Sequence, residues 1–228
     1  MSYSAPLVET FSHAAMGTEF QFTLYTRSGD TSTDDIRRIA DEAFDIVDDL
    51  DNRISVWKND SQISFVNHHA AQEPVKAAPD IIDLLLYCKT VYQESGGAFD
   101  VTVGPLIKCW GFYKGEGVLP TDDALHEALA SVGMDKVRVN ATERTISFAK
   151  PGILLDFGGI GKGLALDRAA QALREHGVKV AALNAGTSSI VAMGAPPGEP
   201  GWKVRIRDPY KDDHYLDEVM LRDESLST

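Results

Sequence analysis

The chain has 228 residues and a mass of 24.8 kDa, with 43% hydrophobic and 25% charged residues. This size and composition are those of a globular protein with a sizeable core, arranged as one large domain or two small ones. A formal net charge of −12 opposes broad electrostatic contact with nucleic acid or anionic lipid. A phosphate-bearing ligand would therefore need a metal ion, one well-placed lysine or the amides at a helix end.

The two cysteines, Cys88 and Cys109, are too few for a disulfide framework and lack the spacing of a metal site. We expect both to be inert or buried thiols. The chain has no uninterrupted apolar run of about 18 residues, so no membrane-spanning helix is expected. Its first residues lack the basic start and apolar run of a signal peptide. The chain as written is therefore expected to be soluble.

Hydrophobic periodicity predicts an alternation of strands and helices. Apolar residues alternate with polar ones over residues 20–24, which indicates a half-buried strand. Apolar positions three and four apart indicate amphipathic helices, and capping residues and glycines mark the helix ends. The predicted helices cover residues 36–50, 79–95 and 121–133 and a segment that ends near residue 176, and a polar, turn-rich stretch is expected over residues 51–67.

The second half of the chain contains most of the predicted strands. Residues 137–139 and 145–148 flank a turn and are expected to form a hairpin. Further strands are predicted over residues 178–183, 189–193, 202–206 and 216–221. Because hairpins are mixed with strand–helix units, the pattern favours an α+β fold, with mixed or antiparallel sheets and packed helices, over a regular parallel fold.

The densest concentration of glycine lies in residues 156–163, with the sequence DFGGIGKG. Such a helix start allows a ligand to approach the backbone closely at the positive end of the helix. Two familiar phosphate motifs do not fit: Asp156 and Gly163 break the P-loop pattern, and two leucines break the dinucleotide fingerprint. The alternative is a tight strand-to-helix turn with a solvent-facing Lys162.

A second cluster, residues 96–106, carries Asp100 directly after Phe99 and just behind a predicted helix stop. The carboxylate of Asp100 can accept hydrogen bonds from a ligand ring or hydroxyl. The alternative is a turn carboxylate that caps nearby amides. Trp110 and Phe112 follow, and we expect both aromatic side chains in the core.

The histidines offer no recognisable catalytic or metal site. His68 and His69 are adjacent, so on a regular element they point apart, and no third ligand stands at a recognised spacing. We expect both at the surface. No Ser-His-Asp or Cys-His arrangement can be assembled from sequence order, so no catalytic residue is predicted.

Taken in order, several segments resemble the ApbE family, the FAD:protein FMN transferases. The resemblance covers almost the whole chain, and it implies one domain of this family over residues 1–228. The matching segments are Met16-Gly17-Thr18, Ser55-Val56-Trp57 with Ser61, Ile63, Ser64 and Asn67, residues 97–106, Trp110-Gly111-Phe112, residues 156–163 and Asn184-Ala185-Gly186.

The family resemblance implies an enzyme that splits FAD and transfers its FMN half, through a phosphoester bond, to a Ser or Thr hydroxyl of a target protein, with release of AMP. FAD is then the substrate, and Mg²⁺ is the metal that neutralises the pyrophosphate. The implied protein partner carries the motif Asp-x-x-(Ser/Thr)-Gly-(Ala/Thr). Nucleic acid is not expected as a partner.

The resemblance also implies roles for matching residues. Gly159 would offer its carbonyl oxygen to the metal, and Trp57 stands where the family often has tyrosine. We expect Lys162 and Asp100 to face each other across one cleft shaped for a flavin dinucleotide. The expected FAD contacts are Met16, Trp57, Ala98, Phe99, Asp100, Asp156 and Lys162.

The chain departs from the family pattern in two places. Thr187, Ser188 and Ser189 follow Asn-Ala-Gly, where the family usually continues with glycine and often an acidic residue. The chain also ends before the family's His-Ile-Asp-Pro segment and the Asp/Thr group that completes the metal site. This 228-residue fragment is therefore expected to transfer FMN weakly or not at all.

Two alternatives to the transferase remain open: a non-catalytic FAD-binding or scaffold domain of the same fold, and an unrelated phosphate-handling enzyme that shares only the glycine turn. The family often works outside the cytoplasmic membrane, in the periplasm or anchored to the membrane, and no export signal is visible here. The strand predicted over residues 216–221 is expected to have an unpaired edge, which favours self-association.

Overall fold

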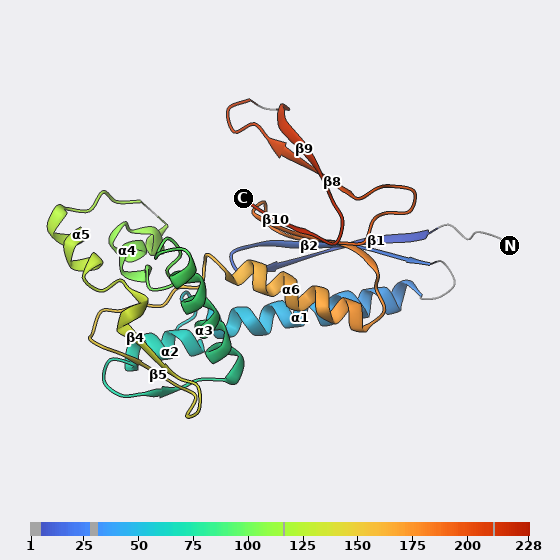
Figure 1. Ribbon diagram of the computed structural model, residues 1–228. Helices are drawn as coiled ribbons and strands as arrows, with labels where there is room; N and C mark the ends of the chain where they lie inside the picture. The colour runs from blue at the N-terminus through green and yellow to red at the C-terminus, as the bar shows by residue number, and fades with distance from the viewer. Residues whose placement is uncertain (1–5, 28–31, 116, 212) are drawn as a thin grey trace. The chain divides into compact units, whose positions relative to one another are not determined.

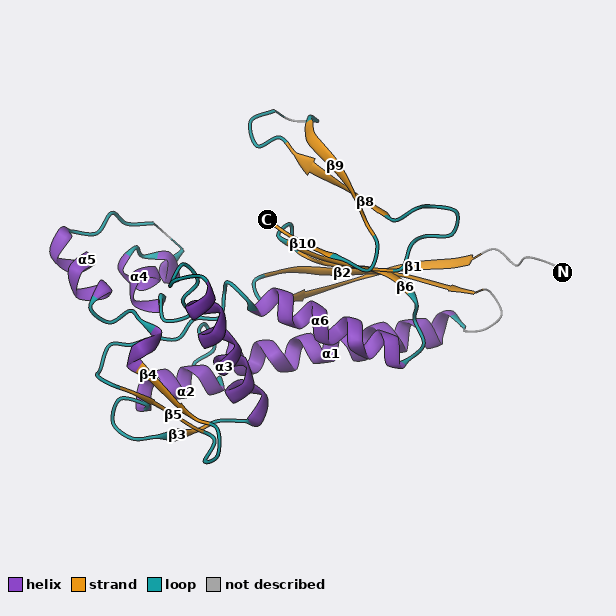
Figure 2. Cartoon of the chain, viewed as in Figure 1, coloured by secondary structure: helices purple, strands orange, loops and turns teal. Residues whose placement is uncertain are grey.

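The computed structural model describes residues 6–27, 32–115, 117–211 and 213–228. The chain divides into two compact units. We call residues 1–51 with 160–228 the sheet unit, and residues 52–159 the helical unit. Figure 1 shows the elements of each unit in chain colours, and Figure 2 shows the same view by secondary structure.

The sheet unit is built on an antiparallel sheet of five strands in the order β1-β2-β6-β7-β10. Two helices, α1 and α6, lie side by side on one face of this sheet (Figure 1). The bounds are β1 Pro6–Ala15, β2 Thr18–Arg27, α1 Thr33–Ile54, α6 Gly161–Glu175, β6 Val180–Ala185, β7 Ser189–Met193 and β10 Ser225–Ser227.

The core of the sheet unit lies between β2 and α1. Phe20, Phe22 and Leu24 alternate along β2 and are fully buried, which confirms the strand predicted there. The ring of Phe22 stacks on Phe44 of α1 at a centroid distance of 4.3 Å. The predicted amphipathic helix is also confirmed, since its apolar positions are buried against the sheet.

A two-stranded hairpin, β8 (Trp202–Arg207) and β9 (Tyr215–Leu221), leaves the sheet on the face opposite to α1 and α6 (Figure 1). Trp202, the first residue of β8, connects the hairpin to the five-stranded sheet. Its indole Nε1 donates to the carbonyl oxygen of Met193 at 3.2 Å, and its ring meets Tyr25 edge-on. The strands predicted in this part of the chain are confirmed.

The helical unit combines short helices with an antiparallel three-stranded sheet in the order β3-β5-β4. Ile81 and Leu85 of α3, together with Ile146 of β5, are fully buried and form its core. The bounds are α2 Gln62–His69, β3 Val75–Lys76, α3 Pro79–Glu94, α4 Gly104–Cys109, the 3₁₀ helix η1 Phe112–Lys114, α5 Asp122–Leu129, the 3₁₀ helix η2 Met134–Lys136, β4 Val137–Asn140 and β5 Thr145–Phe148.

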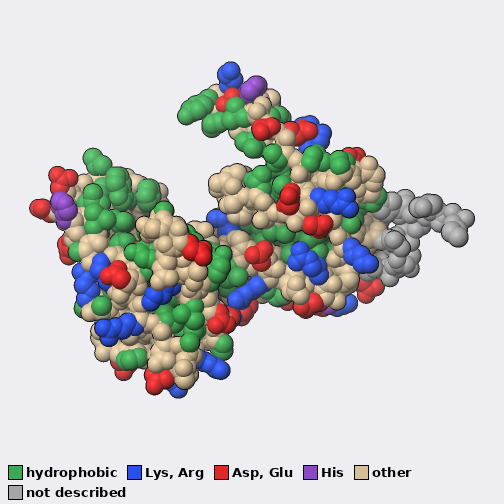
Figure 3. Space-filling view, in the orientation of Figure 1, with side chains coloured by type: hydrophobic (Ala, Val, Ile, Leu, Met, Phe, Trp, Pro, Cys, Tyr) green, Lys and Arg blue, Asp and Glu red, His purple; other side chains and the backbone are tan. Residues whose placement is uncertain are grey.

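Two expectations for the helical unit are wrong. The stretch expected to be turn-rich contains α2, which begins because the Ser61 hydroxyl accepts a hydrogen bond from the amide of Ser64 at 3.0 Å. Trp110 and Phe112 are 36% and 56% exposed rather than in the core. Figure 3 shows hydrophobic side chains on the surface over this α4–α5 part of the unit.

Candidate functional site

The position of Asp156 is set by its backbone neighbours in the helical unit. Leu154 forms an isolated parallel bridge with Val103, and the amide of Asp156 donates to the carbonyl oxygen of Val101 at 2.7 Å. Gly104 permits this close approach, because a Cβ there would lie 2.7 Å from the carbonyl oxygen of Leu154. The two segments that the sequence singled out, residues 96–106 and 156–163, are thus brought together at this bridge.

Asn67 holds the same backbone segment through two hydrogen bonds. Its side-chain Nδ2 donates to the carbonyl oxygen of Leu155 at 3.0 Å, and its Oδ1 accepts from the amide of Leu155 at 2.8 Å. Leu155 therefore has both of its backbone polar groups satisfied by one side chain of α2. In the sequence, Asn67 stands out only as part of a matching segment, and no local pattern indicates this positioning role.

The carboxylate of Asp156 is buried and hydrogen-bonded on both oxygens. Its residue is 8% exposed. Oδ1 accepts the amide of Gly158 at 2.7 Å, and Oδ2 accepts the hydroxyl of Tyr113 at 2.6 Å. Burial raises the pKa of Tyr113 far above its usual value, and the hydrogen bond to Asp156 and its negative charge raise it further. The phenol therefore remains a neutral donor.

Trp57 provides an open aromatic surface beside this pair. Its ring meets Tyr113 edge-on, with a centroid distance of 5.2 Å and an interplanar angle of 89°. The indole is 64% exposed, so most of it remains accessible to a flat ligand. Trp57, Tyr113 and Asp156 form one chain of contacts, which we call the aromatic–carboxylate cluster.

Sequence reasoning missed Tyr113. The residue lies in η1 between Gly111 and Gly115, which adopt φ angles of 74° and 76°. Glycine adopts this left-handed conformation at little cost, whereas most other residues do not. Gly111 therefore separates α4 from η1, and Gly115 ends η1 just after Tyr113. The pattern Gly-Phe-Tyr-Lys-Gly was the available signal.

Asp100 lies on the other segment and is held by its own turn. Its Oδ1 accepts both the amide and the hydroxyl of Thr102, at 2.7 and 2.6 Å. Thr102 is fully buried, and its hydroxyl also accepts the amide of Gly133 at 2.6 Å. The turn interpretation of Asp100 is therefore correct, and it is compatible with a ligand because Oδ2 can accept a further hydrogen bond.

The remaining expected FAD contacts of the helical unit are Ala98 and Phe99. Ala98 is exposed and Phe99 is half-buried. The edge of the Phe99 ring lies beside Gly159, where a Cβ would be 3.6 Å from it. The segments that carry Asp100 and Asp156 meet at the hydrogen bond between Val101 and Asp156. Trp57 is linked to Asp156 through the side chain of Tyr113.

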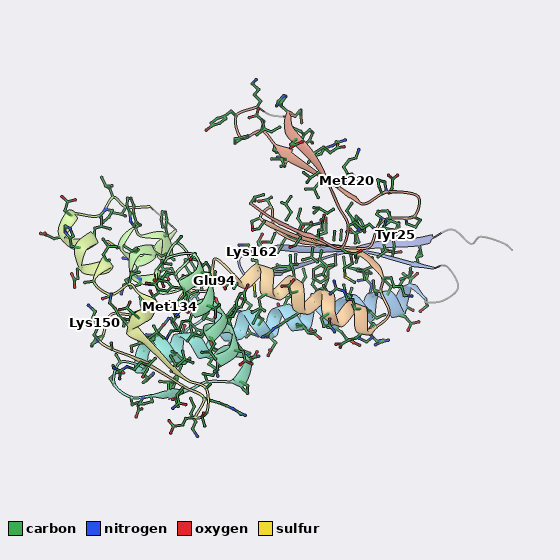
Figure 4. All side chains as sticks on the ribbon, viewed as in Figure 1. Tyr25, Glu94, Met134, Lys150, Lys162 and Met220 are labelled. Carbon is green, nitrogen blue, oxygen red and sulfur yellow. The ribbon has the colours of Figure 1, made fainter. Side chains whose placement is uncertain are left out.

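Met16 and Lys162 belong to the sheet unit. Met16 and Gly17, with φ angles of 50° and 71°, form the two-residue turn between β1 and β2. The next residue, Thr18, lies against Gly186 at the β6–β7 turn. Lys162 lies in the first turn of α6, at the same end of the sheet unit (Figures 1 and 4). Its placement opposite Asp100 stays a prediction.

The fit of a divalent metal is poor in the described part of the chain. Gly159 is exposed, so its carbonyl oxygen can serve as one ligand. However, the described residues contain no group of three or more His, Cys, Asp or Glu side chains that could hold a metal ion. Mg²⁺ in proteins is usually bound by one or two carboxylates, with water and substrate phosphate as its other ligands, so the carbonyl oxygen of Gly159 alone is not a sufficient protein site.

The histidines and cysteines behave largely as expected. His68 and His69 are exposed, as expected, and each bonds through Nδ1 to the backbone carbonyl one helical turn earlier. Cys88 is buried, and burial raises the pKa of its thiol to about 12, whereas Cys109 is partly exposed. None of the described helices has the length and apolar character needed to cross a membrane.

These features define an α+β protein with antiparallel sheets, in which a buried aspartate, a phenol and an exposed indole lie in contact. The chain belongs to the ApbE family, whose model matches residues 16–228. The resemblance found in the sequence is thereby confirmed.

Curated relatives include the FAD:protein FMN transferases of Haemophilus influenzae and Treponema pallidum. Each is 28% identical to this chain, over 207 and 189 residues respectively. The matches cover 89% and 77% of this chain, but 59% and 52% of the relatives. The chain therefore spans just over half the length of these two proteins.

Solved structures confirm the expected fold class. The ApbE protein from Thermotoga maritima matches with a TM-score of 0.84 and 26% identity, covering 96% of this chain and 69% of that one. The Pseudomonas stutzeri flavinyl transferase ApbE, in its apo form, matches with a TM-score of 0.82 and 25% identity, covering 97% and 69%.

Proposed function

We propose that this chain is the FAD-binding part of a transferase that moves the FMN half of FAD to a Ser or Thr hydroxyl of an acceptor protein. The observation that carries the proposal is the match of residues 16–228 to a family whose relatives are named FAD:protein FMN transferases. The chemistry of the two groups of candidate residues supports it.

The helical unit offers two kinds of contact that suit a flavin nucleotide. The exposed indole of Trp57 can stack on a flat ring. The carboxylates of Asp100 and Asp156 only accept hydrogen bonds, so they suit the hydroxyl and ring N–H groups of FAD. They do not suit its phosphate oxygens, which are also negatively charged acceptors. The pyrophosphate therefore requires cationic or N–H groups elsewhere.

The start of α6 in the sheet unit supplies such groups. Ile160 occupies the N-cap position and provides no side-chain cap, so the first amides of this 15-residue helix can bind an anion. Lys162 in the first turn adds a positive charge to the helix dipole. We assign this helix start to binding of the pyrophosphate. The acidic composition of the chain predicted that a phosphate ligand would need a local group of this kind, a lysine or the amides at a helix end.

The proposed reaction is a phosphoryl transfer. The acceptor hydroxyl oxygen forms a bond to the phosphorus of the FMN half, and the bond between that phosphorus and the bridging pyrophosphate oxygen breaks. AMP leaves with the bridging oxygen, and the hydroxyl proton passes to water or to the leaving phosphate. The residues of this chain would contribute by binding and orienting FAD, since catalysis of this kind depends mainly on position and charge stabilisation.

Mg²⁺ and the acceptor motif Asp-x-x-(Ser/Thr)-Gly-(Ala/Thr) are the finer parts of the proposal. The described residues contain no cluster of acidic side chains beside the carbonyl oxygen of Gly159, so the part proposed for them is to bind and orient FAD. Location outside the cytoplasmic membrane is likewise proposed from the family alone.

FAD binding by the 228-residue chain is the first test. Lys162→Met should weaken binding by at least about tenfold, because it removes the positive charge next to the pyrophosphate. Lys179→Met, a change at an exposed lysine of the same unit, is the matched control. Absence of FAD binding by the unmodified chain at millimolar FAD would refute the proposal.

Transfer itself is tested with the complete product of the gene, because this chain spans just over half of the curated relatives. FAD, Mg²⁺ and an acceptor bearing the motif are incubated, and flavin fluorescence on the denatured acceptor is measured. Covalent fluorescence with equimolar AMP supports the transferase. Tight FAD binding without either product supports the non-catalytic alternative.

Self-association is proposed for the β8–β9 hairpin. β9 has one strand partner among the described residues, and Leu216 and Met220 on it are 60% and 40% exposed. An open strand edge with exposed apolar side chains favours pairing with another chain. Light scattering over a dilution series should show a concentration-dependent mass, and a monomer at high concentration would contradict this.

A further inference from the structure

The aromatic–carboxylate cluster contains a residue to which neither the resemblance nor the comparisons assign a role. Tyr113 lies between the two expected FAD contacts Trp57 and Asp156, and touches both. We propose that Tyr113 is a positioning residue, which holds the carboxylate of Asp156 and the ring of Trp57 in the arrangement that binds the flavin nucleotide. This inference rests on the proposed function.

The hydrogen bond from Tyr113 fixes the direction of the Asp156 carboxylate. With only the hydrogen bond from the amide of Gly158 to Oδ1, the Asp156 side chain could still rotate about its bonds. The second hydrogen bond, from Tyr113 to Oδ2 at 2.6 Å, fixes the plane of the carboxylate. A carboxylate has about four lone-pair positions, of which two are used here. A ligand hydroxyl or ring N–H can therefore bind to Asp156 without displacing Tyr113.

The hydroxyl of Tyr113 is a hydrogen-bond donor to Asp156. Burial, the hydrogen bond to Asp156 and the negative charge of Asp156 all raise its pKa. The hydroxyl has one proton, which is committed to Asp156. The hydroxyl is thus directed at Asp156, and its effect on a ligand passes through Asp156.

The ring of Tyr113 acts on Trp57. An exposed tryptophan on a loop loses side-chain freedom when a ligand stacks on it, and this loss reduces affinity. The edge-on contact with Tyr113 restricts the indole before the ligand arrives. The glycines on both sides of η1 place Tyr113 in position, so the cluster is held by the backbone of the helical unit.

The experiment uses Tyr113→Phe, which removes the hydroxyl and keeps the ring. FAD affinity is measured by quenching of flavin fluorescence, and circular dichroism checks the fold. We expect about tenfold weaker binding, because a hydrogen bond to a charged group is lost. Tyr87→Phe, at a 59% exposed tyrosine of α3, is the matched control and should leave affinity unchanged within about twofold.

A double-mutant cycle separates positioning from a general loss of stability. Because Tyr113 acts through Asp156, the effect of Tyr113→Phe should shrink to less than about threefold in an Asp156→Asn background. Equal effects of Tyr113→Phe in both backgrounds would overturn the inference. So would unchanged affinity in Tyr113→Phe while the unmodified chain binds FAD. If the unmodified chain binds no FAD, the proposed function fails as well, which is a distinct result.

A second measurement keeps the inference testable if Tyr113→Phe does not fold. Ultraviolet absorbance measures how many of the seven tyrosines are ionised at each pH. In the unmodified chain at least one tyrosine should still be protonated at about pH 11, one unit above the ordinary tyrosine pKa. Asp156→Asn should lower the pH at which this tyrosine ionises. Ionisation of all seven tyrosines together near pH 10, in the folded protein, would overturn the inference.

Discussion

Gly104 offers the sharpest test of how the two site segments are held together. A Cβ at this position would lie 2.7 Å from both the carbonyl oxygen and the Cβ of Leu154, whereas ordinary contact begins near 3.4 Å. The two backbones must therefore separate by about 0.7 Å to admit an alanine. One atom of this contact is backbone, so rotation of a side chain cannot relieve it.

Gly104→Ala is expected to destabilise the helical unit by about 1–3 kcal/mol, the usual cost of overpacking a close contact. The same displacement stretches the hydrogen bond between the amide of Asp156 and the carbonyl oxygen of Val101, which is 2.7 Å long. Because this bond aligns the segments that carry Asp100 and Asp156, FAD affinity should fall several-fold, in addition to the loss of stability.

Urea unfolding followed by circular dichroism measures the loss of stability, and fluorescence titration with FAD measures the loss of affinity. Gly163→Ala is the matched control for stability, because no atom lies within 4 Å of a Cβ there and the backbone is helical. That change should be neutral or stabilise by up to about 1 kcal/mol. An unfolding free energy of Gly104→Ala within about 0.5 kcal/mol of that of the unmodified chain would refute the reasoning.

Three further predictions concern the same unit. Thr102→Val should cost about 1–3 kcal/mol of unfolding free energy, since it leaves the buried amide of Gly133 unpaired and removes one of the two hydrogen bonds to Asp100, and an unchanged urea midpoint would contradict it. Asn67→Ala should cost a similar amount of unfolding free energy, about 1–3 kcal/mol, because both backbone groups of Leu155 lose their hydrogen-bond partner. Protection of the Leu155 amide from hydrogen exchange should fall, and unchanged protection would argue against the positioning role of Asn67. The free energy of unfolding should also decline as the pH rises above about 10, because the unfolded chain releases the phenolic proton that folded Tyr113 retains. The slope due to this group is at most about 1.4 kcal/mol per pH unit. Urea midpoints should therefore fall less with pH in Tyr113→Phe than in the unmodified chain, and parallel curves would count against the effect.

Local sequence patterns identified most elements where the apolar period was clear. The helix at Pro79 and the helix capped by Thr121 begin where their signals indicate, because proline geometry and a capping hydroxyl act within one turn. The glycine after α6 also ends that helix as expected, with Gly177 at a φ of 82°. These signals need no information from distant parts of the chain.

The strand β1 escaped prediction because two of its inward positions carry polar residues. His13 points toward α1, where its Nε2 lies 2.9 Å from the carboxylate of Asp48 and its ring stacks on Phe44. Glu9 is likewise on the partly buried side of the strand. A histidine at an inward position breaks the alternation on which strand prediction depends, and only its partners on the neighbouring helix explain it.

For the candidate site, the sequence by itself identified the candidate residues: Asp100 after Phe99, Asp156 before a glycine-rich helix start, and Trp57 in a segment shared with the family. Only the tertiary structure decided how the groups of the helical unit are held. Tyr113 reaches Asp156 across 43 positions, and Asn67 reaches Leu155 across 88. Such contacts form when distant segments pack, and their free energy depends on geometry that no local pattern of residues records.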